Sequence, residues 1–426
     1  MRPLTLPKLF VLAAPMLIAA CTDDRPNPVA PAAPVAPVLQ SEGRGAFQRY
    51  VAIGTSVSMG WRSDGVVASA QATSWPVLLA ELAHRTMTVP AIAEPGCGAP
   101  IAAPIAGGVR TSGEGIGQAF DTRACAPSVA GVSLPANNVA ITAATTRNAL
   151  YSTPGNITGE YLRLYSRVLA PGQSQVTAMM GQEPKVVTIE LGANEVLGAR
   201  SGVFLPGVNV VPVAAWEADY LKVLDSAQKV AKHVALVGLI DHAESFPSFR
   251  TGHEIWQGRA AFAQLWVEVS PDCENSPNLL FVAARVPAAA AQGGYNARTG
   301  AGRAPFSCVN YPSATGIQDY VLGPDDVAAL DAQLAQMDAI ILREAQRRGF
   351  AHFRLAALYE DVNVKAPFDP IALLMQQQPY GRYVSLDGFH PTADGARVIA
   401  NAAARAFDAR YGFGITGSGA LFAAGH

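Results

Sequence analysis

The sequence is poor in charge and in cysteine, and it has no cluster of basic residues. Of its 426 residues, 15% are charged, and the formal net charge is -2. Proteins that follow a nucleic-acid backbone carry a basic patch or stripe, so nucleic acid is not an expected partner. The five cysteines and seven histidines show no CxxC or HxxxH spacing, and the pattern therefore predicts no metal site.

The sequence also has no apolar run at its start that is long enough to span a bilayer. Arg2 and Lys8 precede the apolar stretch Leu9–Ala20, and "LIAAC" places small residues before Cys21. A helix of this length covers only about 18 Å of a hydrocarbon layer of roughly 30 Å. Residues 1–21 are therefore predicted to be an export signal that resembles a bacterial lipoprotein signal, with Cys21 as the lipidated new N-terminus. An ordinary cleaved signal is the alternative.

The segment that follows is a tether rather than part of a fold. Residues 22–45 contain five prolines among alanine and valine, without an amphipathic period, which is typical of a semi-extended linker. We expect the folded domain to cover residues 46–412 and a C-terminal tail to cover 413–426. Localisation is predicted to be the cell envelope through a lipid anchor in the membrane, and Thr22 after the cysteine favours the outer membrane.

Four cysteines remain if Cys21 is lipidated, and they allow three pairings. We expect disulfides in an oxidising compartment. Cys97 with Cys125 and Cys273 with Cys308 are the favoured pairs, because each pair brackets one Gly/Pro-rich segment.

Short apolar runs alternate with amphipathic ones along the domain. The expected strands are 47–54, 137–143, 185–191, 233–240 and 351–358, and the expected helices are 74–85, 214–232, 323–349 and 391–412. This alternation predicts an α/β fold, a three-layer α/β/α sandwich around a mostly parallel five-stranded sheet. Residues 86–136 and 241–322 interrupt it as long loop insertions that cover a pocket or form small subdomains.

The stretch "YVAIGTSVSMGW" places Ser56 just after the first expected strand. Gly54 permits a tight turn there, and ligands bind at the carboxyl ends of parallel strands. A serine at this position is either a turn or cap residue or a nucleophile. Ser58 is the nearest rival nucleophile.

Two further segments favour the nucleophile. In "SLDGFHPTADGARVIANAA", Asp387 lies three residues before His390, a spacing that lets a carboxylate orient an imidazole. In "VVTIELGANEVLG", Asn194 follows a strand end, where its amide either donates to an oxyanion or stabilises the turn.

These segments together resemble the SGNH hydrolases, also called the GDSL lipase/esterase family. "GTSVSMG", "NNVAITAATT", "GANE" and "DGFH" match the four family blocks in order, over residues 48 to 405. The resemblance implies a flavodoxin-like sheet, Ser56 as nucleophile, His390 as base and Asp387 as its orienting carboxylate. It also implies an oxyanion hole formed by Ser56, Ala143 and Asn194, and no cofactor.

The sequence departs from the family pattern at four positions. Thr55, Val57 and Glu195 replace the usual Asp, Leu and Asp, and Ala143 occupies the place of a glycine. A positive φ at Ala143 would cost about 1 to 2 kcal/mol.

The expected activity is that of a serine esterase or lipase that cleaves carboxylic esters through an acyl-enzyme. Its expected substrate is a lipid or an acylated glycan. The alternative is an envelope lipoprotein of the same fold with weak or no catalysis, which binds glycans or partners. Five aromatic residues of the second insertion either line an acyl groove or form a subdomain core: Phe246, Phe249, Trp256, Phe262 and Trp266.

Overall fold

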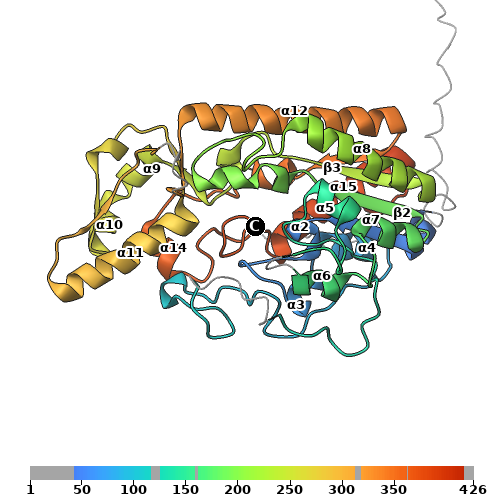
Figure 1. Cartoon of the computed structure of the whole chain (residues 1–426), viewed down its shortest axis with the longest axis horizontal. Helices are drawn as coiled ribbons and strands as arrows, with labels where there is room; N and C mark the ends of the chain where they lie inside the picture. The colour runs from blue at the N-terminus through green and yellow to red at the C-terminus, as the bar shows by residue number, and fades with distance from the viewer. Residues whose placement is uncertain (1–42, 117–124, 159–161, 312–317, 362, 417–426) are drawn as a thin grey trace, which may run out of the picture. The chain divides into compact units, whose positions relative to one another are not determined.

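The computed structural model describes residues 43–116, 125–158, 162–311, 318–361 and 363–416 (Figure 1). The predicted signal, Cys21, residues 22–42 of the linker and residues 417–426 of the tail lie outside the described residues. Residues 43–46 form a helical turn, so regular structure is present three residues before the expected domain boundary. None of the described helices has the length and apolar character to span a membrane.

The domain is organised around four parallel strands. They lie in the order β1 (Tyr50–Gly54), β2 (Val186–Glu190), β3 (His233–Gly238) and β9 (Ala351–Arg354). Every residue of β1 and β2 is buried, which accounts for their nearly continuous apolar sequence, since a sheet covered on both faces needs no polar alternation.

The expected fifth strand is not a regular strand, and this corrects the five-stranded prediction. Residues 137–141 do run parallel to β1, because Ala52 N–H donates to Asn137 O (3.0 Å) and Val139 N–H donates to Ala52 O (2.9 Å). The Asn138 amide oxygen, however, accepts from Ala140 N–H (3.1 Å), and its amide nitrogen donates to Ser58 O (2.7 Å). These two bonds leave the pairing with β1 intact, because Ile141 N–H also donates to Gly54 O (3.1 Å). The segment therefore lies beside β1 with one isolated parallel bridge, between Ala52 and Asn138, rather than as a regular strand.

Helices cover both faces of the sheet. On one face α15 (Ala393–Tyr411) packs against β9, β3 and α4 (Trp75–Leu82). On the other, α12 (Pro324–Arg348) contacts β3 and β9, and α8 (Val213–Val230) contacts α12 and α7 (Gln175–Gly181), which lies on β1. Figure 1 shows α12 and α8 along the same side of β3. The predicted three-layer α/β/α sandwich is therefore confirmed, with a four-stranded sheet.

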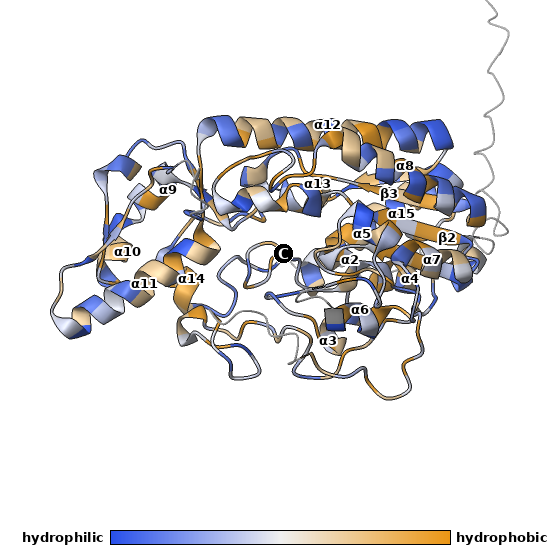
Figure 2. Ribbon diagram, in the orientation of Figure 1, coloured by the Kyte–Doolittle hydropathy of each residue, from blue (hydrophilic) through white to orange (hydrophobic). Residues whose placement is uncertain are grey.

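The long helix α12 shows why the sequence folds in this way. Asp325 and Asp326 lie in its first turn and Arg347 and Arg348 in its last, which matches the helix dipole, and Gly349 ends it in the left-handed conformation. Hydrophobic and hydrophilic residues alternate along α12 in Figure 2, as expected for a helix with one buried face.

The first insertion, residues 86–136, has little regular structure. Within its described part it contains the short 3-10 helix η2 (Ile105–Gly107) and isolated bridges such as Ile101 with Arg110. The predicted disulfide between Cys97 and Cys125 joins its two halves.

The second insertion forms a folded subdomain, which is one of the two alternatives that the sequence left open for residues 241–322. It contains a three-stranded sheet in the order β4-β6-β8 and a parallel pair, β5 with β7. The predicted disulfide between Cys273 and Cys308 lies inside it. Its elements are β4 (Phe249–Thr251), α9 (Gly252–Gln257), α10 (Arg259–Gln264), β5 (Val267–Val269), β6 (Leu279–Phe281), α11 (Val282–Thr299), β7 (Ala304–Phe306) and β8 (Val321–Leu322).

The remaining helices are short and connect these parts. They are α2 (Ser56–Met59), α3 (Ala68–Gln71), α5 (Thr146–Tyr151), α6 (Leu162–Val168), α13 (Ala356–Tyr359) and α14 (Pro370–Met375).

Candidate active site

Ser56 lies at the carboxyl end of β1, where the chain turns sharply into α2. Gly54 is required by the close approach of this turn, because a Cβ atom there would lie 2.6 Å from the Ser58 Oγ. Ser56 is the first residue of α2, so its N–H has no partner within the helix and remains available to a ligand.

A buried carboxylate on the neighbouring strand holds the turn. Glu190 ends β2, and its side chain accepts hydrogen bonds from Thr55 N–H (3.0 Å) and the Thr55 hydroxyl (2.7 Å). It also accepts from the N–H (3.2 Å) and the hydroxyl (2.9 Å) of Ser58. Burial raises the pKa of Glu190, and these four hydrogen bonds oppose the rise.

The same contacts explain two features of the sequence. Thr55, where the family has Asp, donates its hydroxyl to Glu190. Ser58, the rival nucleophile, is fully buried and bonded to Glu190, and its hydroxyl accepts from the Trp75 indole N–H (3.1 Å). Ser58 therefore has a structural role in this turn.

The loop before α15 brings a carboxylate, an imidazole and Ser56 into one line. The Asp387 Oδ2 lies 2.9 Å from the His390 Nδ1, and the His390 Nε2 lies 2.9 Å from the Ser56 Oγ. The three predicted residues thus meet, although 334 positions separate Ser56 from His390.

Asp387 is held by more than its imidazole partner. Its carboxylate accepts from the backbone N–H groups of Phe389 (2.9 Å), His390 (2.9 Å) and Asp64 (2.7 Å). Burial by itself raises the pKa of Asp387, but the charge of His390 and the hydrogen bonds from His390 and Phe389 outweigh burial and lower this pKa to about 2. The carboxylate is therefore ionised at neutral pH.

The first insertion supports Asp387 from the other side. Asp64 adopts the left-handed conformation (φ 56°) and directs its N–H at Asp387. The buried Arg110 donates to Asp64 O (2.9 Å) and Ala99 O (2.8 Å), and it forms an ion pair with the Asp64 side chain (2.6 Å). Arg110 thus connects residues 86–136 to the loop of His390.

The predicted oxyanion residues lie at the ends of the adjacent segments. The Asn194 amide nitrogen donates to Ala144 O (2.9 Å), and an amide nitrogen has a second hydrogen for a ligand. Ala143 has a φ of 57°, in the left-handed region that costs an alanine about 1 to 2 kcal/mol. Ser56 and Asn194 line the cavity described next, and Ala143 is not among its lining residues.

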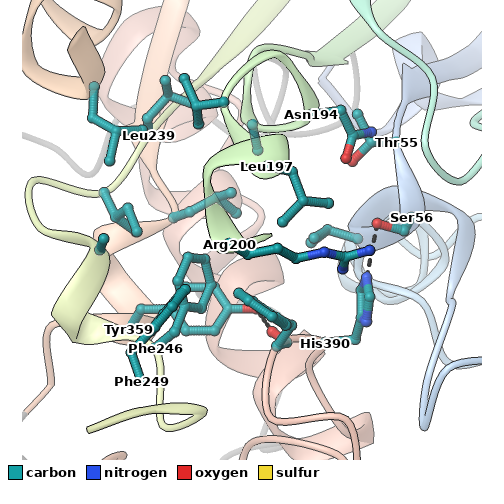
Figure 3. Close-up of a pocket in the computed structure, with 18 of the residues that line it drawn as sticks. Thr55, Ser56, Asn194, Leu197, Arg200, Leu239, Phe246, Phe249, Tyr359 and His390 are labelled. Carbon is teal, nitrogen blue, oxygen red and sulfur yellow. Dashed lines mark hydrogen bonds between the residues drawn. The ribbon is translucent and has the colours of Figure 1, made fainter. Parts of the chain in front are cut away.

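A mostly apolar cavity of about 100 Å³ opens beside Ser56 and His390 (Figure 3). Leu239 and Ile240 follow β3, Leu330 and Leu334 come from α12, and Phe246 and Phe249 come from the second insertion. The wall also includes Leu197, Arg200, Leu355, Tyr359 and Phe389.

The five aromatic residues of the second insertion divide between the two predicted roles. Phe246 and Phe249 line the cavity. Phe262 is buried in the subdomain against Phe306. Trp256 and Trp266 lie under the guanidinium groups of Arg259 and Arg303 and do not line the cavity.

The described residues contain one group of side chains with metal-like spacing, Asp272 with Cys273 and Cys308. Both sulfur atoms of this group are bonded to each other in a disulfide, so no thiolate is available as a ligand.

Four residues near the site were not singled out by sequence reasoning. Glu190 could have been found from the sequence, because it is a single acidic residue in an otherwise apolar strand. No sequence pattern marks Asp64, Arg110 or Arg200. Their roles depend on contacts between segments that are distant in the sequence.

Comparisons with known proteins agree with this architecture. The model of the GDSL-like lipase/acylhydrolase family matches residues 50–403. The chain belongs to this family and is a carboxylic ester hydrolase. No curated protein sequence matches the chain.

Solved structures of esterases are similar at low identity. The acetylxylan esterase Axe2 from Geobacillus stearothermophilus is 14% identical, with 85% of this chain and 94% of that chain covered and a TM-score of 0.35. LAE5, an alpha/beta hydrolase from the metagenome of Lake Arreo, is 13% identical, with 87% and 99% covered and a TM-score of 0.34. Scores this low support no inference about substrate.

We expect Glu190→Gln to lower the free energy of unfolding by about 2 to 4 kcal/mol, because an amide leaves buried donors of Thr55 and Ser58 unpaired. Urea denaturation measures the change. Glu268→Gln, at an exposed position of β5, is the matched control and should stay within about 0.5 kcal/mol of the wild type. Equal effects in the two variants would contradict the role of Glu190.

The lowered pKa of Asp387 predicts a pH-dependent stability. The folded-state pKa of about 2 lies below the ordinary value of 3.8, so the ionised carboxylate stabilises the fold above pH 4, and this stabilisation is lost as the pH falls toward 2. The difference in unfolding free energy between wild type and Asp387→Asn should therefore be about 2 kcal/mol at pH 6 and shrink below pH 4.

Urea denaturation at a series of pH values tests this prediction. Asp325→Asn, at an exposed position in the first turn of α12, is the control and should show no comparable trend. A difference between wild type and Asp387→Asn that stays constant from pH 6 to pH 2.5 would show that the ionised carboxylate does not stabilise the fold.

Proposed function

We propose that the protein hydrolyses carboxylic esters with Ser56 as nucleophile, His390 as general base and then acid, and Asp387 as the carboxylate that orients His390. The observation that carries this proposal is the continuous line of hydrogen bonds from Asp387 through His390 to Ser56, each of 2.9 Å. A hydroxyl, an imidazole and a carboxylate in this order constitute the arrangement that activates serine for acyl transfer.

In the first step the Ser56 Oγ attacks the ester carbonyl while the His390 Nε2 takes the hydroxyl proton. The carbonyl oxygen becomes an oxyanion, and His390 then gives its proton to the departing alcohol. In the second step water gives a proton to His390 and its oxygen attacks the acyl carbon. The bond between that carbon and the Ser56 Oγ breaks, His390 returns the proton to this Oγ, and the acid leaves.

The oxyanion donors in this proposal are the Ser56 N–H, the Asn194 amide and the Ala143 N–H. Within the described part of the chain no acceptor is bonded to the Ala143 N–H, so this group is free to bind the developing charge. Donors fixed at that position stabilise the transition state more than the ground state.

The cavity favours a small apolar acyl group. Most of its walls are formed by apolar side chains, chiefly leucine, isoleucine and phenylalanine. An apolar cavity of roughly 150 Å³ holds a molecule as large as benzene, and the volume of about 100 Å³ here therefore suits an acyl chain of a few carbons. The substrate in this proposal is an acylated lipid or an acylated glycan.

Labelling with a fluorophosphonate probe tests the nucleophile. The wild-type protein should label, and Ser56→Ala should not label and should lose at least about 10³-fold in kcat on short p-nitrophenyl esters. Ser58→Ala removes the neighbouring hydroxyl and should keep its label. Labelling of the Ser56→Ala protein would refute the assignment, and an unlabelled wild type would favour a binding protein of the same fold.

We also propose that Cys21 is lipidated and anchors the protein to the bacterial cell envelope, in the outer membrane. The support is the sequence "LIAAC" after an apolar stretch and the proline-rich tether that follows. Metabolic palmitate labelling should be lost in Cys21→Ser and retained in Cys97→Ser. Label that persists in Cys21→Ser would overturn the anchor.

A further inference from the structure

Arg200 places a positive charge in a cavity whose other walls are mostly apolar. It belongs to the 3-10 helix η5 (Leu197–Ser201), which follows Asn194, and it lines the same cavity as Ser56 and His390. The cavity has no acidic lining residue. In Figure 3 the Arg200 side chain extends toward the Ser56–His390 pair.

The guanidinium of Arg200 is not used by the protein itself. In the described part of the chain, Arg200 forms no hydrogen bond or ion pair through its side chain. Other arginines of the domain are paired, such as Arg250 with Glu254 and Arg354 with Asp338. Arg200 therefore offers its five donors in a fork that suits a carboxylate or phosphate.

The backbone that carries Arg200 is held in place. Gly198 O accepts hydrogen bonds from the Ser201 hydroxyl (2.9 Å) and the Asn209 amide (3.3 Å). No larger residue fits at Gly198, because a Cβ atom would lie 2.0 Å from Asn209 O. These contacts hold the backbone of η5, while the exposed Arg200 side chain stays available to a ligand.

We propose that Arg200 binds an anionic group on the alcohol part of the ester, and that the natural substrates are esters of acidic alcohols. This inference rests on the proposed function. The acyl part has its place among Leu239, Phe246 and Phe249, at the opposite end of the cavity from Ser56 in Figure 3. The departing alcohol takes its proton from the His390 Nε2 and so lies on the side to which Arg200 points.

A matched pair of esters tests the proposal. 4-Butyryloxybenzoate carries a carboxylate on its leaving group, and its methyl ester is the neutral partner with the same acyl chain. Arg200→Gln should lower the ratio of kcat/KM for the anionic over the neutral ester about tenfold, the size of a charge-assisted hydrogen bond. Arg200→Glu should lower it further, and added salt should weaken the wild-type preference.

Arg298→Gln is the matched control. Arg298 is an exposed arginine in the last turn of α11 and does not line the cavity, so its variant should keep the wild-type ratio. An equal loss on both esters in Arg200→Gln would show that Arg200 stabilises the oxyanion or the fold instead, and an unchanged ratio would overturn the proposal outright.

The two proposals can fail separately. Activity that survives in Ser56→Ala refutes the nucleophile, whereas an inactive Ser56→Ala beside an unchanged ratio in Arg200→Gln refutes only the role of Arg200.

A butyryl ester of a uronic acid glycoside and one of glycerol phosphate then identify the anion. The ester with the larger loss of kcat/KM in Arg200→Gln carries the preferred group, and no loss with either ester contradicts the proposal.

Discussion

The hydrogen bonds between the Glu190 carboxylate and the turn after β1 are the interaction on which the site depends. A charged group buried between two strands is costly unless donors surround it. Here Thr55 and Ser58 supply four. The turn cannot move away from β2 without leaving that carboxylate unpaired, and Ser56 lies inside this turn. The position of the Ser56 Oγ is therefore determined by a contact between the ends of β1 and β2.

The remaining groups of the site reach Ser56 because parallel strands end at one edge of the sheet. Asn194 follows β2, the cavity wall begins after β3, and the loop before α15 brings His390 to the same edge. The second insertion adds Phe246 and Phe249 and so limits the space for an acyl group. The order of the strands thus brings the polar groups of the site together. The inserted subdomain supplies part of the apolar cavity wall.

The sequence predicts the layers well because burial on both faces of a strand leaves a clear apolar run. It predicts a strand at residues 137–143, where the chain does bond β1 through its backbone but forms only an isolated bridge. For residues 241–322 it leaves a pocket cover and a subdomain as alternatives, because strands of two or three residues are too short to leave a period-2 pattern.

For the site, local spacing shows that Asp387 can reach His390, and the ends of expected strands single out Ser56 and Asn194. The family resemblance then implies their roles. Neither local spacing nor the family resemblance identifies Arg110 or Arg200. Their roles depend on what the fold places beside them. Arg110 contacts the backbone of Asp64, and Arg200 lines an apolar cavity. Neither residue lies in a recognisable motif.

The contact of Arg110 with Asp64 also limits how far this domain can be reduced. Residues 86–136 contain little regular structure and look dispensable in a ribbon drawing. Their excision would nevertheless remove the guanidinium that holds the Asp64 backbone, whose N–H donates to Asp387. A minimal version of the enzyme therefore has to retain this irregular segment.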